Sequence, residues 1–281
     1  MNLCDYHEMH ALLQRAGFHF SRSKGQNFLT ASWVPERIAI ESGLDKNTGV
    51  VEIGPGVGCL TEQLSKAAGR VLAFELDEKL RPVLAETLAP YDNIELIFGD
   101  VMRADLRREV AEHLGALRPV LCANLPYNIT TPVLKKIFEA RCFDTVTVMV
   151  QREVAERMCA SAGDKDYGAF TLLTEWYAEP ELCFTVGAEC FVPRPKVISA
   201  VVRLKMRAEP PIDIDEAALF RVIRAAFNQR RKPLTNALSG LFGKEQTKAA
   251  IAACGFSETV RGESLSLRDF AALTRALETE K

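Results

Sequence analysis

Short apolar runs and amphipathic stretches alternate through the first half of the chain. The apolar runs have the length of strands, and the stretches between them repeat apolar residues at helical spacing. The predicted strands are Val50–Ile53, Val71–Phe74, Ile94–Phe98, Val120–Ala123 and Thr145–Val150. The predicted helices between them are Leu60–Ala67, Glu78–Leu88, Leu106–Leu114 and Pro132–Glu139. This alternation predicts an α/β fold with a parallel sheet and ligands at the carboxyl ends of its strands.

Two later segments complete the predicted sheet. Leu182–Val186 and Ser199–Met206 read as strands of an antiparallel hairpin, which brings the mostly parallel sheet to seven strands. The connection Phe191–Val197 holds two prolines and is expected to be stiff and extended. Outside the sheet, helices are predicted at Tyr6–Gly17, Pro35–Ser42, Glu153–Met158 and Phe170–Tyr177, and an irregular segment at Lys24–Leu29.

The composition changes around Glu209–Asp213, which predicts a domain boundary. Residues 1–208 are expected to form a catalytic domain and residues 209–281 a small, all-helical C-terminal domain. Short helices are predicted from Glu216 onward, with breaks near Gly240, Gly243 and Gly255.

Three alternate glycines follow the first of the predicted strands. Gly54, Gly56 and Gly58 lack Cβ atoms, so the backbone there can take a positive φ and a ligand can approach it closely. The pattern is E-x-G-x-G-x-G with Glu52 inside the strand, whereas the dinucleotide fingerprint would place its third glycine at Cys59. A strand-to-helix turn is the plainer interpretation, but three glycines within five residues exceed what a turn requires.

The next strands end in polar residues. Glu75 follows the second strand, Asp100 the third and Asn124 the fourth. Glu75 is placed to accept hydrogen bonds from ribose hydroxyls and Asp100 from an adenine amine. Each could instead cap a helix, which is the commoner use of Asp or Asn at such a place. Together with the glycines, they favour a ligand cleft.

The four residues Asn124-Leu125-Pro126-Tyr127 fit the amino-methyltransferase pattern [DNS]-x-P-[YF]. An exocyclic adenine amine is a poor nucleophile because its lone pair is delocalised into the ring. The Asn124 side-chain oxygen and the Leu125 carbonyl can accept its two N–H groups and so localise that lone pair. Pro126 stiffens the turn, and Tyr127 offers a face for base stacking. An ordinary β-turn is the alternative.

Composition narrows the class of protein. The hydrophobic share of 48% and the charged share of 26% are typical of a globular protein, and no apolar run has the length of a membrane span. Asp5, His7 and Glu8 stand where a signal peptide would need a basic and then an apolar region, so a cytoplasmic location is expected. The eight cysteines include no C-x-x-C pair and are expected to be reduced core thiols. No metal site is expected, because the four histidines form no convincing ligand set.

Basic residues gather in one window although the net charge is −2. The window Arg221–Lys232 holds no acidic residue. A solvated helix face is the plain interpretation, and contact with an RNA backbone is the alternative. The candidate RNA-binding residues are Arg221, Arg224, Arg230, Arg231 and Lys232.

The chain resembles the KsgA/RsmA type of small-subunit (16S) rRNA adenine N6,N6-dimethyltransferase. The resemblance runs nearly end to end and rests on five segments: G-Q-N-F-L at Gly25–Leu29, E-I-G-P-G-V-G-C-L-T at Glu52–Thr61, N-L-P-Y-N-I at Asn124–Ile129, F-V-P-R-P-K-V at Phe191–Val197 and F-N-Q-R-R-K at Phe227–Lys232. It departs from the family pattern at Pro233, where Thr is usual, and at Ile198, where an acidic residue is common.

The resemblance implies a class I, Rossmann-like methyltransferase domain that uses S-adenosylmethionine, and a substrate of two adjacent adenines near the 3′ end of 16S rRNA in the immature small ribosomal subunit. Tyr127 would stack on the target base, with Phe191 covering the other face. A monomer is expected. The implied cofactor-binding residues are Gln26, Asn27, Leu29, Glu52, Gly54, Gly56, Gly58, Glu75, Asp100 and Asn124. The implied catalytic residues are Asn124, Leu125, Pro126, Tyr127 and Phe191.

Three other functions stay open at this point. An Erm-like enzyme would methylate 23S rRNA, and a DNA adenine methyltransferase would share N-x-P-Y but normally carries a larger target-recognition region. A ribosome-assembly factor could keep the fold without catalysis, although intact Glu75, Asp100 and Asn124 argue against lost chemistry.

Overall fold

A computed structural model describes residues 1–18 and 26–278 of the chain, so Lys24 and Gly25 of the predicted irregular segment lie outside the described residues. Internal contacts divide the chain into two units. The first comprises Met1–Ala155 and Pro180–Ala208, and the second Glu156–Glu179 and Glu209–Lys281. The division at 208/209 coincides with the expected boundary, but the segment 156–179 joins the second unit because its helix packs on helices of that unit.

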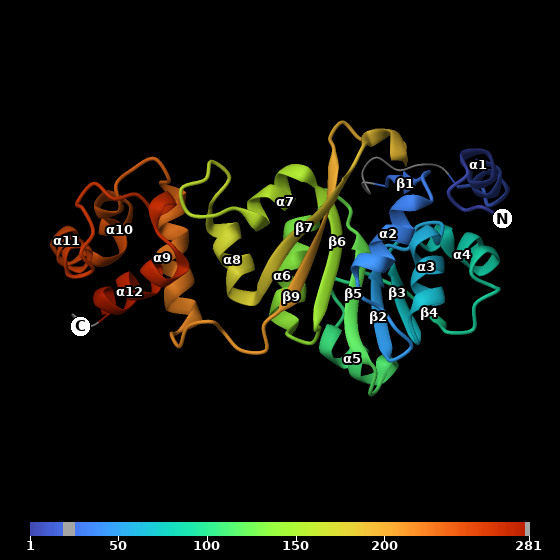
Figure 1. The fold of residues 1–281 in the computed structure, drawn as a ribbon, viewed down its shortest axis with the longest axis horizontal. Coiled ribbons are helices and arrows are strands. Elements are labelled where there is room, and N and C mark those ends of the chain that lie inside the picture. Colours follow the sequence, from blue (N-terminus) through green and yellow to red (C-terminus); the bar gives the residue numbers. More distant parts are fainter. Residues whose placement is uncertain (19–25, 279–281) are drawn as a thin grey trace. The chain divides into compact units, whose positions relative to one another are not determined.

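The first unit is built on a seven-stranded sheet with the strand order β4-β3-β2-β5-β6-β9-β7 (Figure 1). β2 pairs in parallel with β3 and β5, β3 with β4, and β5 with β6, whereas β9 is antiparallel to β6. The α/β prediction and all seven strands are therefore confirmed. The strands are β2 (Thr48–Ile53), β3 (Arg70–Glu75), β4 (Ile94–Phe98), β5 (Arg118–Asn124), β6 (Thr145–Gln151), β7 (Ala178–Val186) and β9 (Ser199–Met206).

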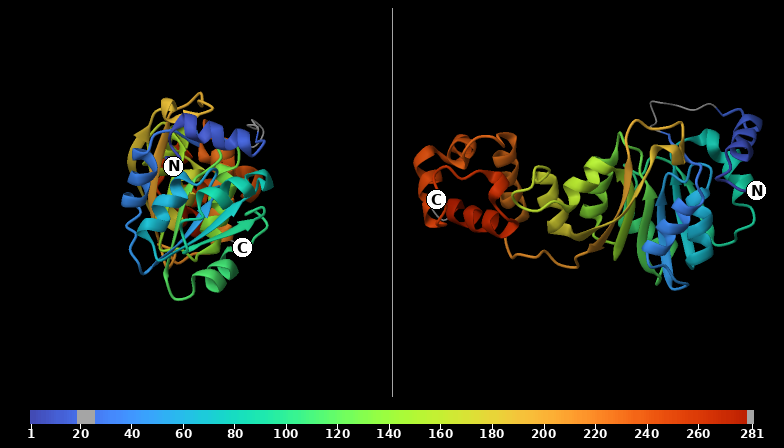
Figure 2. Two further views of the ribbon diagram at one scale, coloured as in Figure 1. Left: turned by 90° about the vertical axis from the view of Figure 1, so that its right-hand side faces the viewer. Right: turned by 45° about the horizontal axis from the view of Figure 1, so that its top comes forward.

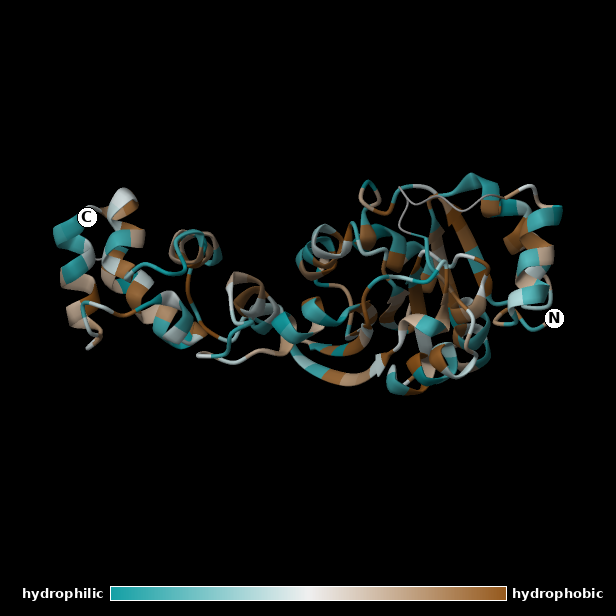
Figure 3. Cartoon of the chain, turned by 90° about the horizontal axis from the view of Figure 1, so that it is seen from above, coloured by the Kyte–Doolittle hydropathy of each residue, from teal (hydrophilic) through white to brown (hydrophobic). Residues whose placement is uncertain are grey.

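Helices cover both faces of this sheet, since every residue of the central strand β2 is buried. Figure 3 shows the hydrophobic residues concentrated along the strands. α2 packs against α3, and α5 against α6. The helical elements are α1 (Tyr6–Arg15), α2 (Trp33–Glu41), α3 (Cys59–Ala67), the 3₁₀ turn η2 (Glu78–Leu80), α4 (Arg81–Thr87), α5 (Leu106–Leu114), α6 (Thr130–Ala140), α7 (Arg152–Cys159) and the 3₁₀ turn η3 (Ala188–Cys190).

A second, two-stranded sheet was not predicted. β1 (Phe28–Leu29) pairs antiparallel with β8 (Phe191–Val192), so that Phe28 lies opposite Val192 and Leu29 opposite Phe191. The two strands fall in the segments that the sequence indicated as irregular and as extended. Their pairing fixes part of the N-terminal segment across the carboxyl edge of the large sheet.

The second unit is helical (Figures 1 and 2). Its elements are α8 (Ala169–Tyr177), α9 (Glu216–Asn228), α10 (Leu234–Phe242), α11 (Lys244–Ala253), the 3₁₀ turn η4 (Gly262–Ser264) and α12 (Leu267–Glu278). α9 packs on α8, α10 and α12, around a core that includes Leu219, Leu238 and Phe270. Gly243 separates α10 from α11 as predicted, and Gly255 follows α11.

The predicted break at Gly240 is wrong, because α10 continues through it. A glycine costs a helix interior about 1 kcal/mol relative to alanine. The burial of Leu234 and Leu238 on the same helix offsets that cost.

All eight cysteines are free, and four of them are buried: Cys4, Cys59, Cys122 and Cys190. The Cys59 thiol donates to the Leu3 carbonyl over 3.1 Å and so fastens the N-terminal segment to the start of α3. Among the described helices, none combines the length and the apolar character that a membrane crossing requires.

Candidate active site

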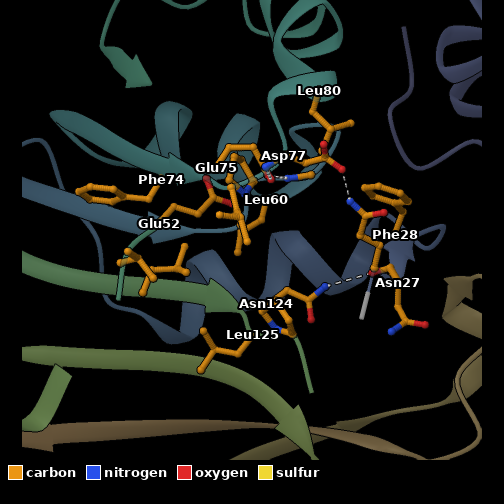
Figure 4. Close-up of a pocket in the computed structure, with 18 of the residues that line it drawn as sticks. Asn27, Phe28, Glu52, Leu60, Phe74, Glu75, Asp77, Leu80, Asn124 and Leu125 are labelled. Carbon is orange, nitrogen blue, oxygen red and sulfur yellow. Dashed lines mark hydrogen bonds between the residues drawn. The ribbon is translucent and has the colours of Figure 1, made fainter. Parts of the chain in front are cut away.

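The carboxyl ends of β2, β3, β4 and β5 meet at a cavity of about 220 Å³ in the first unit (Figure 4). The cavity brings together most of the residues that the sequence predicted for the site. These are Gln26, Asn27, Leu29, Glu52, Gly54, Gly56, Glu75, Asp100, Asn124, Leu125, Pro126 and Tyr127. Gly58 and Phe191 do not line it.

The glycine loop lies between β2 and α3, and each of its glycines has a positive φ. Gly54, at φ 73°, has no atom within 4 Å of the place where a Cβ would stand, so its backbone faces open space. A Cβ on Gly56, at φ 62°, would stand 2.9 Å from the Phe28 ring. Gly58, at φ 96°, caps α3 and faces Leu88. The loop therefore leaves room for a ligand at Gly54 and for Phe28 at Gly56.

Glu75 ends β3 and is held by two backbone N–H groups. Its Oε2 accepts from Gly56 over 3.3 Å and its Oε1 from Asp77 over 2.8 Å. Burial raises the pKa of Glu75. The carboxylate joins the glycine loop to the end of the neighbouring strand, and both oxygens keep further acceptor capacity.

Asp100 follows β4, and its capping contact, one of the two predicted roles, is observed. Its Oδ1 accepts from the Met102 backbone N–H over 2.9 Å, as a capping residue does. Its Oδ2 lies 3.9 Å from the Arg103 guanidinium, and 40% of its side chain is exposed. Asp100 lines the cavity, and its Oδ2 accepts no hydrogen bond from the described residues, so its contact with a ligand stays a prediction.

Glu52 is the most deeply buried acid of the cavity, with 1% of its surface exposed. Its Oε2 has no hydrogen-bond partner among the described residues. Burial raises the pKa of Glu52 to about 8, because the carboxylate would lose its hydration there. The side chain is thus mostly protonated at neutral pH and can donate as well as accept.

Residues 26–29 cross the cavity and are fastened on both sides of it, as Figure 4 shows. The Gln26 side-chain amide donates to Asp77 Oδ2 over 3.0 Å. On the opposite side, the Asn124 side-chain amide donates to the Asn27 carbonyl over 3.4 Å. This segment, which we call the strap, is therefore held over the cavity by Asp77, which follows β3, and by Asn124, which ends β5.

The turn after β5 is also fixed at several points. Leu125 N–H donates to the Met149 carbonyl of β6 over 3.1 Å. The Thr130 hydroxyl donates to the Pro126 carbonyl over 3.1 Å. Since the Asn124 amide nitrogen is engaged by the strap, its Oδ1 is left as the acceptor that the side chain can offer to a ligand.

Several lining residues were missed by the sequence analysis: Leu76, Asp77, Leu80, Val101, Asn128 and Ile129. Asp77 is the most informative of them. It is 4% exposed, accepts from the Lys79 N–H at the start of η2 and holds Gln26. From the sequence, Asp77 looks like an ordinary helix cap. Only its position two residues after Glu75 could have suggested that it belongs to the site.

Phe191 lies in β8 opposite Leu29 and is 3% exposed. It belongs to the same hydrophobic core as Phe28 and Leu29, and its contact with a target base stays a prediction.

The basic residues of the window Arg221–Lys232 lie in the second unit and differ in their contacts. Arg230 contacts Glu263 over 3.1 Å and donates to the Lys165 carbonyl over 2.6 Å. Arg221 lies 3.4 Å from Glu278. Within this window, the exposed cations with no ion pair among the described residues are Arg224, Arg231 and Lys232.

Comparisons with known proteins agree with this geometry. The profile of the family described as "Ribosomal RNA adenine dimethylase" matches residues 17–278. "Ribosomal RNA small subunit methyltransferase A" of Geobacillus thermodenitrificans is 44% identical over 95% of this chain and 94% of its own. The protein of the same name from Streptococcus sanguinis is 41% identical over 100% of this chain and 99% of its own.

Two solved structures share the fold over most of the chain. The 23S rRNA methyltransferase ErmE has a TM-score of 0.69 and 27% identity, over 89% of this chain and 99% of its own. A dimethyladenosine transferase from Plasmodium falciparum has a TM-score of 0.70 and 23% identity, over 87% of this chain and 95% of its own.

Proposed function

This chain belongs to the ribosomal RNA adenine dimethylase family and is an rRNA methyltransferase, and we propose that its substrate is a pair of adjacent adenines near the 3′ end of 16S rRNA. The proposed reaction places two methyl groups on the N6 amine of each adenine. The small-subunit assignment is supported by the curated relatives, which are named for that subunit and match this chain nearly end to end.

We propose S-adenosylmethionine as the methyl donor, and the cavity fits it in three respects. Gly54 leaves open space beside its backbone, and a buried oxygen of Glu52 has no hydrogen-bond partner among the described residues. Glu75 and Asp100 offer acceptors at successive strand ends. When bound, this cofactor supplies an electrophilic methyl group on a sulfonium. The residues proposed to hold it are Gln26, Asn27, Leu29, Glu52, Gly54, Gly56, Glu75, Asp100 and Asn124.

The Asn124–Tyr127 turn carries the functional proposal, since it lines the same cavity as the cofactor residues. The strap takes the Asn124 amide nitrogen, so Oδ1 is oriented as an acceptor for one amine N–H of adenine. The Leu125 carbonyl accepts the other N–H in this proposal. Two acceptors favour a pyramidal nitrogen with a localised lone pair, and the contribution is chiefly positioning and electrostatics.

Tyr127 supplies the face on which the target base stacks, and Pro126 fixes the turn that presents it. After the first transfer, the amine has one N–H left to donate. The proposed dimethylation therefore requires that one of the two acceptors suffices for the second transfer.

Recognition of the RNA outside the base is assigned to the second unit. The exposed cations Arg224, Arg231 and Lys232 are available to phosphates. Arg221 and Arg230 are paired with Glu278 and Glu263 instead, and they are not assigned a phosphate contact. This refines the five-residue prediction, because Arg230 is already engaged by Glu263 and Lys165.

The decisive experiment offers labelled S-adenosylmethionine together with four substrates side by side. These are under-methylated small subunits, naked 16S rRNA, 23S rRNA and duplex DNA. We expect N6,N6-dimethyladenosine in the small-subunit material alone, with the particle preferred over naked rRNA.

Label in 23S rRNA would instead support the Erm-like function, which the similarity to ErmE makes the second candidate. Label in DNA alone would contradict an RNA substrate. Cofactor binding without transfer to any substrate would indicate an assembly factor that retains the fold.

A further inference from the structure

A hydrogen bond ties the stacking residue of the proposed site to a different strand of the sheet. Tyr127 follows β5, and its hydroxyl lies 2.6 Å from the Ser199 hydroxyl at the start of β9. Ser199 is 0% exposed. The contact was not predicted, since 72 residues separate its two ends.

Neither hydroxyl has another side-chain hydrogen bond within the described residues. Burial raises the pKa of Tyr127, so the phenol stays protonated at neutral pH. The contact is therefore one between two neutral hydroxyls. Among the described residues, it is the one side-chain hydrogen bond that the Tyr127 hydroxyl makes.

Ser199 is itself held firmly. It lies opposite Gln151 in the antiparallel ladder between β9 and β6. β6 in turn pairs with β5, where Met149 lies opposite Asn124 and accepts the Leu125 N–H. The turn that carries Asn124 is thus fastened to β6 by its backbone and to β9 by the Tyr127 hydroxyl.

Stacking needs the ring of Tyr127 but not its hydroxyl, because every base stacks on an aromatic face. Stacking alone would therefore be served by phenylalanine, and the hydroxyl of Tyr127 is explained by its contact with Ser199. We propose that Ser199 is a positioning residue of the methyl transfer, which holds the Tyr127 ring at the angle that places the target amine beside Asn124. This inference rests on the proposed function, since it takes Tyr127 as the stacking face.

A double-mutant cycle tests the proposal with unaltered protein, Tyr127→Phe, Ser199→Ala and the double variant. The readouts are kcat, KM for under-methylated small subunits and the dissociation constant for S-adenosylmethionine. We expect each single variant to lower kcat by roughly 3- to 10-fold, the worth of one hydrogen bond, with KM and cofactor affinity little changed. The double variant should be no slower than the slower single variant, because both remove the same contact.

Thr147→Val provides the matched control. Thr147 lies in β6, is 0% exposed, and its hydroxyl has no hydrogen-bond partner among the described residues. Removing that hydroxyl should leave kcat unchanged, which separates the effect of the Tyr127 contact from that of altering the sheet.

Multiplicative losses in the double variant would overturn the proposal, as would an unchanged kcat in Ser199→Ala. Both outcomes leave the proposed function standing, since the unaltered protein would still methylate small subunits. No methyl transfer by the unaltered protein would overturn the proposed function and this inference with it.

Discussion

At the scale of single residues, the chemistry of two side chains in the cavity depends on their hydrogen bonds. Glu52 has a carboxyl oxygen without a hydrogen-bond partner among the described residues, and the Asn124 amide nitrogen donates to the Asn27 carbonyl of the strap. Burial keeps the Glu52 carboxyl protonated, and the hydrogen bond to the strap orients the Asn124 amide. Each leads to a measurable consequence.

Glu52 should make the cofactor-free protein less stable as the pH rises. An unfolded Glu releases its proton near pH 4.3, whereas folded Glu52 keeps it up to about pH 8. Between these values the folded state binds more protons, so the free energy of unfolding falls with rising pH, by on the order of a few kcal/mol in total. Urea unfolding from pH 5 to 8 should show this slope, and Glu52→Gln should flatten it.

Glu139→Gln is the control for that slope. Glu139 is exposed on α6, where it lies 3.5 Å from Lys135, and its replacement should leave the pH dependence as in the unaltered protein. An equal slope in Glu52→Gln would show that the buried carboxyl is not its source.

Asn124→Ala should separate cofactor binding from chemistry. It removes the acceptor proposed for the adenine amine, so we expect kcat to fall by about 10²-fold or more while the dissociation constant for S-adenosylmethionine changes by a small factor. Calorimetry and initial rates measure the two quantities. Equal losses in both would make Asn124 chiefly a cofactor ligand.

Asn124→Asp divides the role of that side chain further. The aspartate keeps an acceptor but cannot donate to the Asn27 carbonyl. Its rate should fall between those of the unaltered protein and Asn124→Ala.

At the scale of elements, the site is a glycine loop covered by a strap. The Phe28 ring of the strap lies against Gly56, where no other residue would leave it room, and Leu29 is fixed by the pairing of β1 with β8. Asp77 after β3 and Asn124 at the end of β5 hold the rest of the strap. Enclosure of the cavity thus depends on the glycine loop as much as on the strap itself.

Gly56→Ala should therefore weaken cofactor binding as well as stability. Its Cβ would stand 2.9 Å from Phe28, and the backbone has φ 62°. Gly43→Ala is the matched control, since Gly43 has φ 59° but no atom within 4 Å of a Cβ. Both should lose about 1 kcal/mol of stability through backbone strain, but only Gly56→Ala should lose affinity for S-adenosylmethionine. Equal affinities would show that the contact with Phe28 does not matter to binding.

At the scale of the whole molecule, the chain combines a net charge of −2 with an RNA substrate. The distribution of charge accounts for this combination, because Arg224, Arg231 and Lys232 are exposed, have no ion pair among the described residues and lie in a window without an acidic residue. Acidic neighbours such as Glu263 and Glu278 neutralise only part of the basic window.

Replacing both Arg231 and Lys232 by Glu should weaken rRNA binding. If the two contact phosphates, the slope of log affinity against log salt should become shallower by about 1.4 to 1.8. Filter binding from 50 to 300 mM salt measures it. Arg230→Gln should keep the slope and lower the melting temperature instead, because its partners are Glu263 and Lys165. An unchanged slope in the double variant would remove these residues from the RNA contact.

The sequence alone determined the α/β framework and most of the cavity. Alternation of strands and helices fixes a parallel sheet, and a parallel sheet gathers its carboxyl ends at one edge. Gly54, Glu75, Asp100 and Asn124 therefore had to meet wherever their strands paired. Helical propensity alone was a weaker guide, as the continuous helix through Gly240 demonstrates.

Only the tertiary structure decided which contacts enclose the cavity and how far the pKa of Glu52 is raised. The pairing of β1 with β8, the bond from Gln26 to Asp77 and the contact of Tyr127 with Ser199 join segments far apart in sequence. The raised pKa of Glu52 depends on burial by the whole domain, and the engagement of Arg230 depends on Glu263. Periodicity and motifs describe neighbours along the chain, whereas these features arise from neighbours in space.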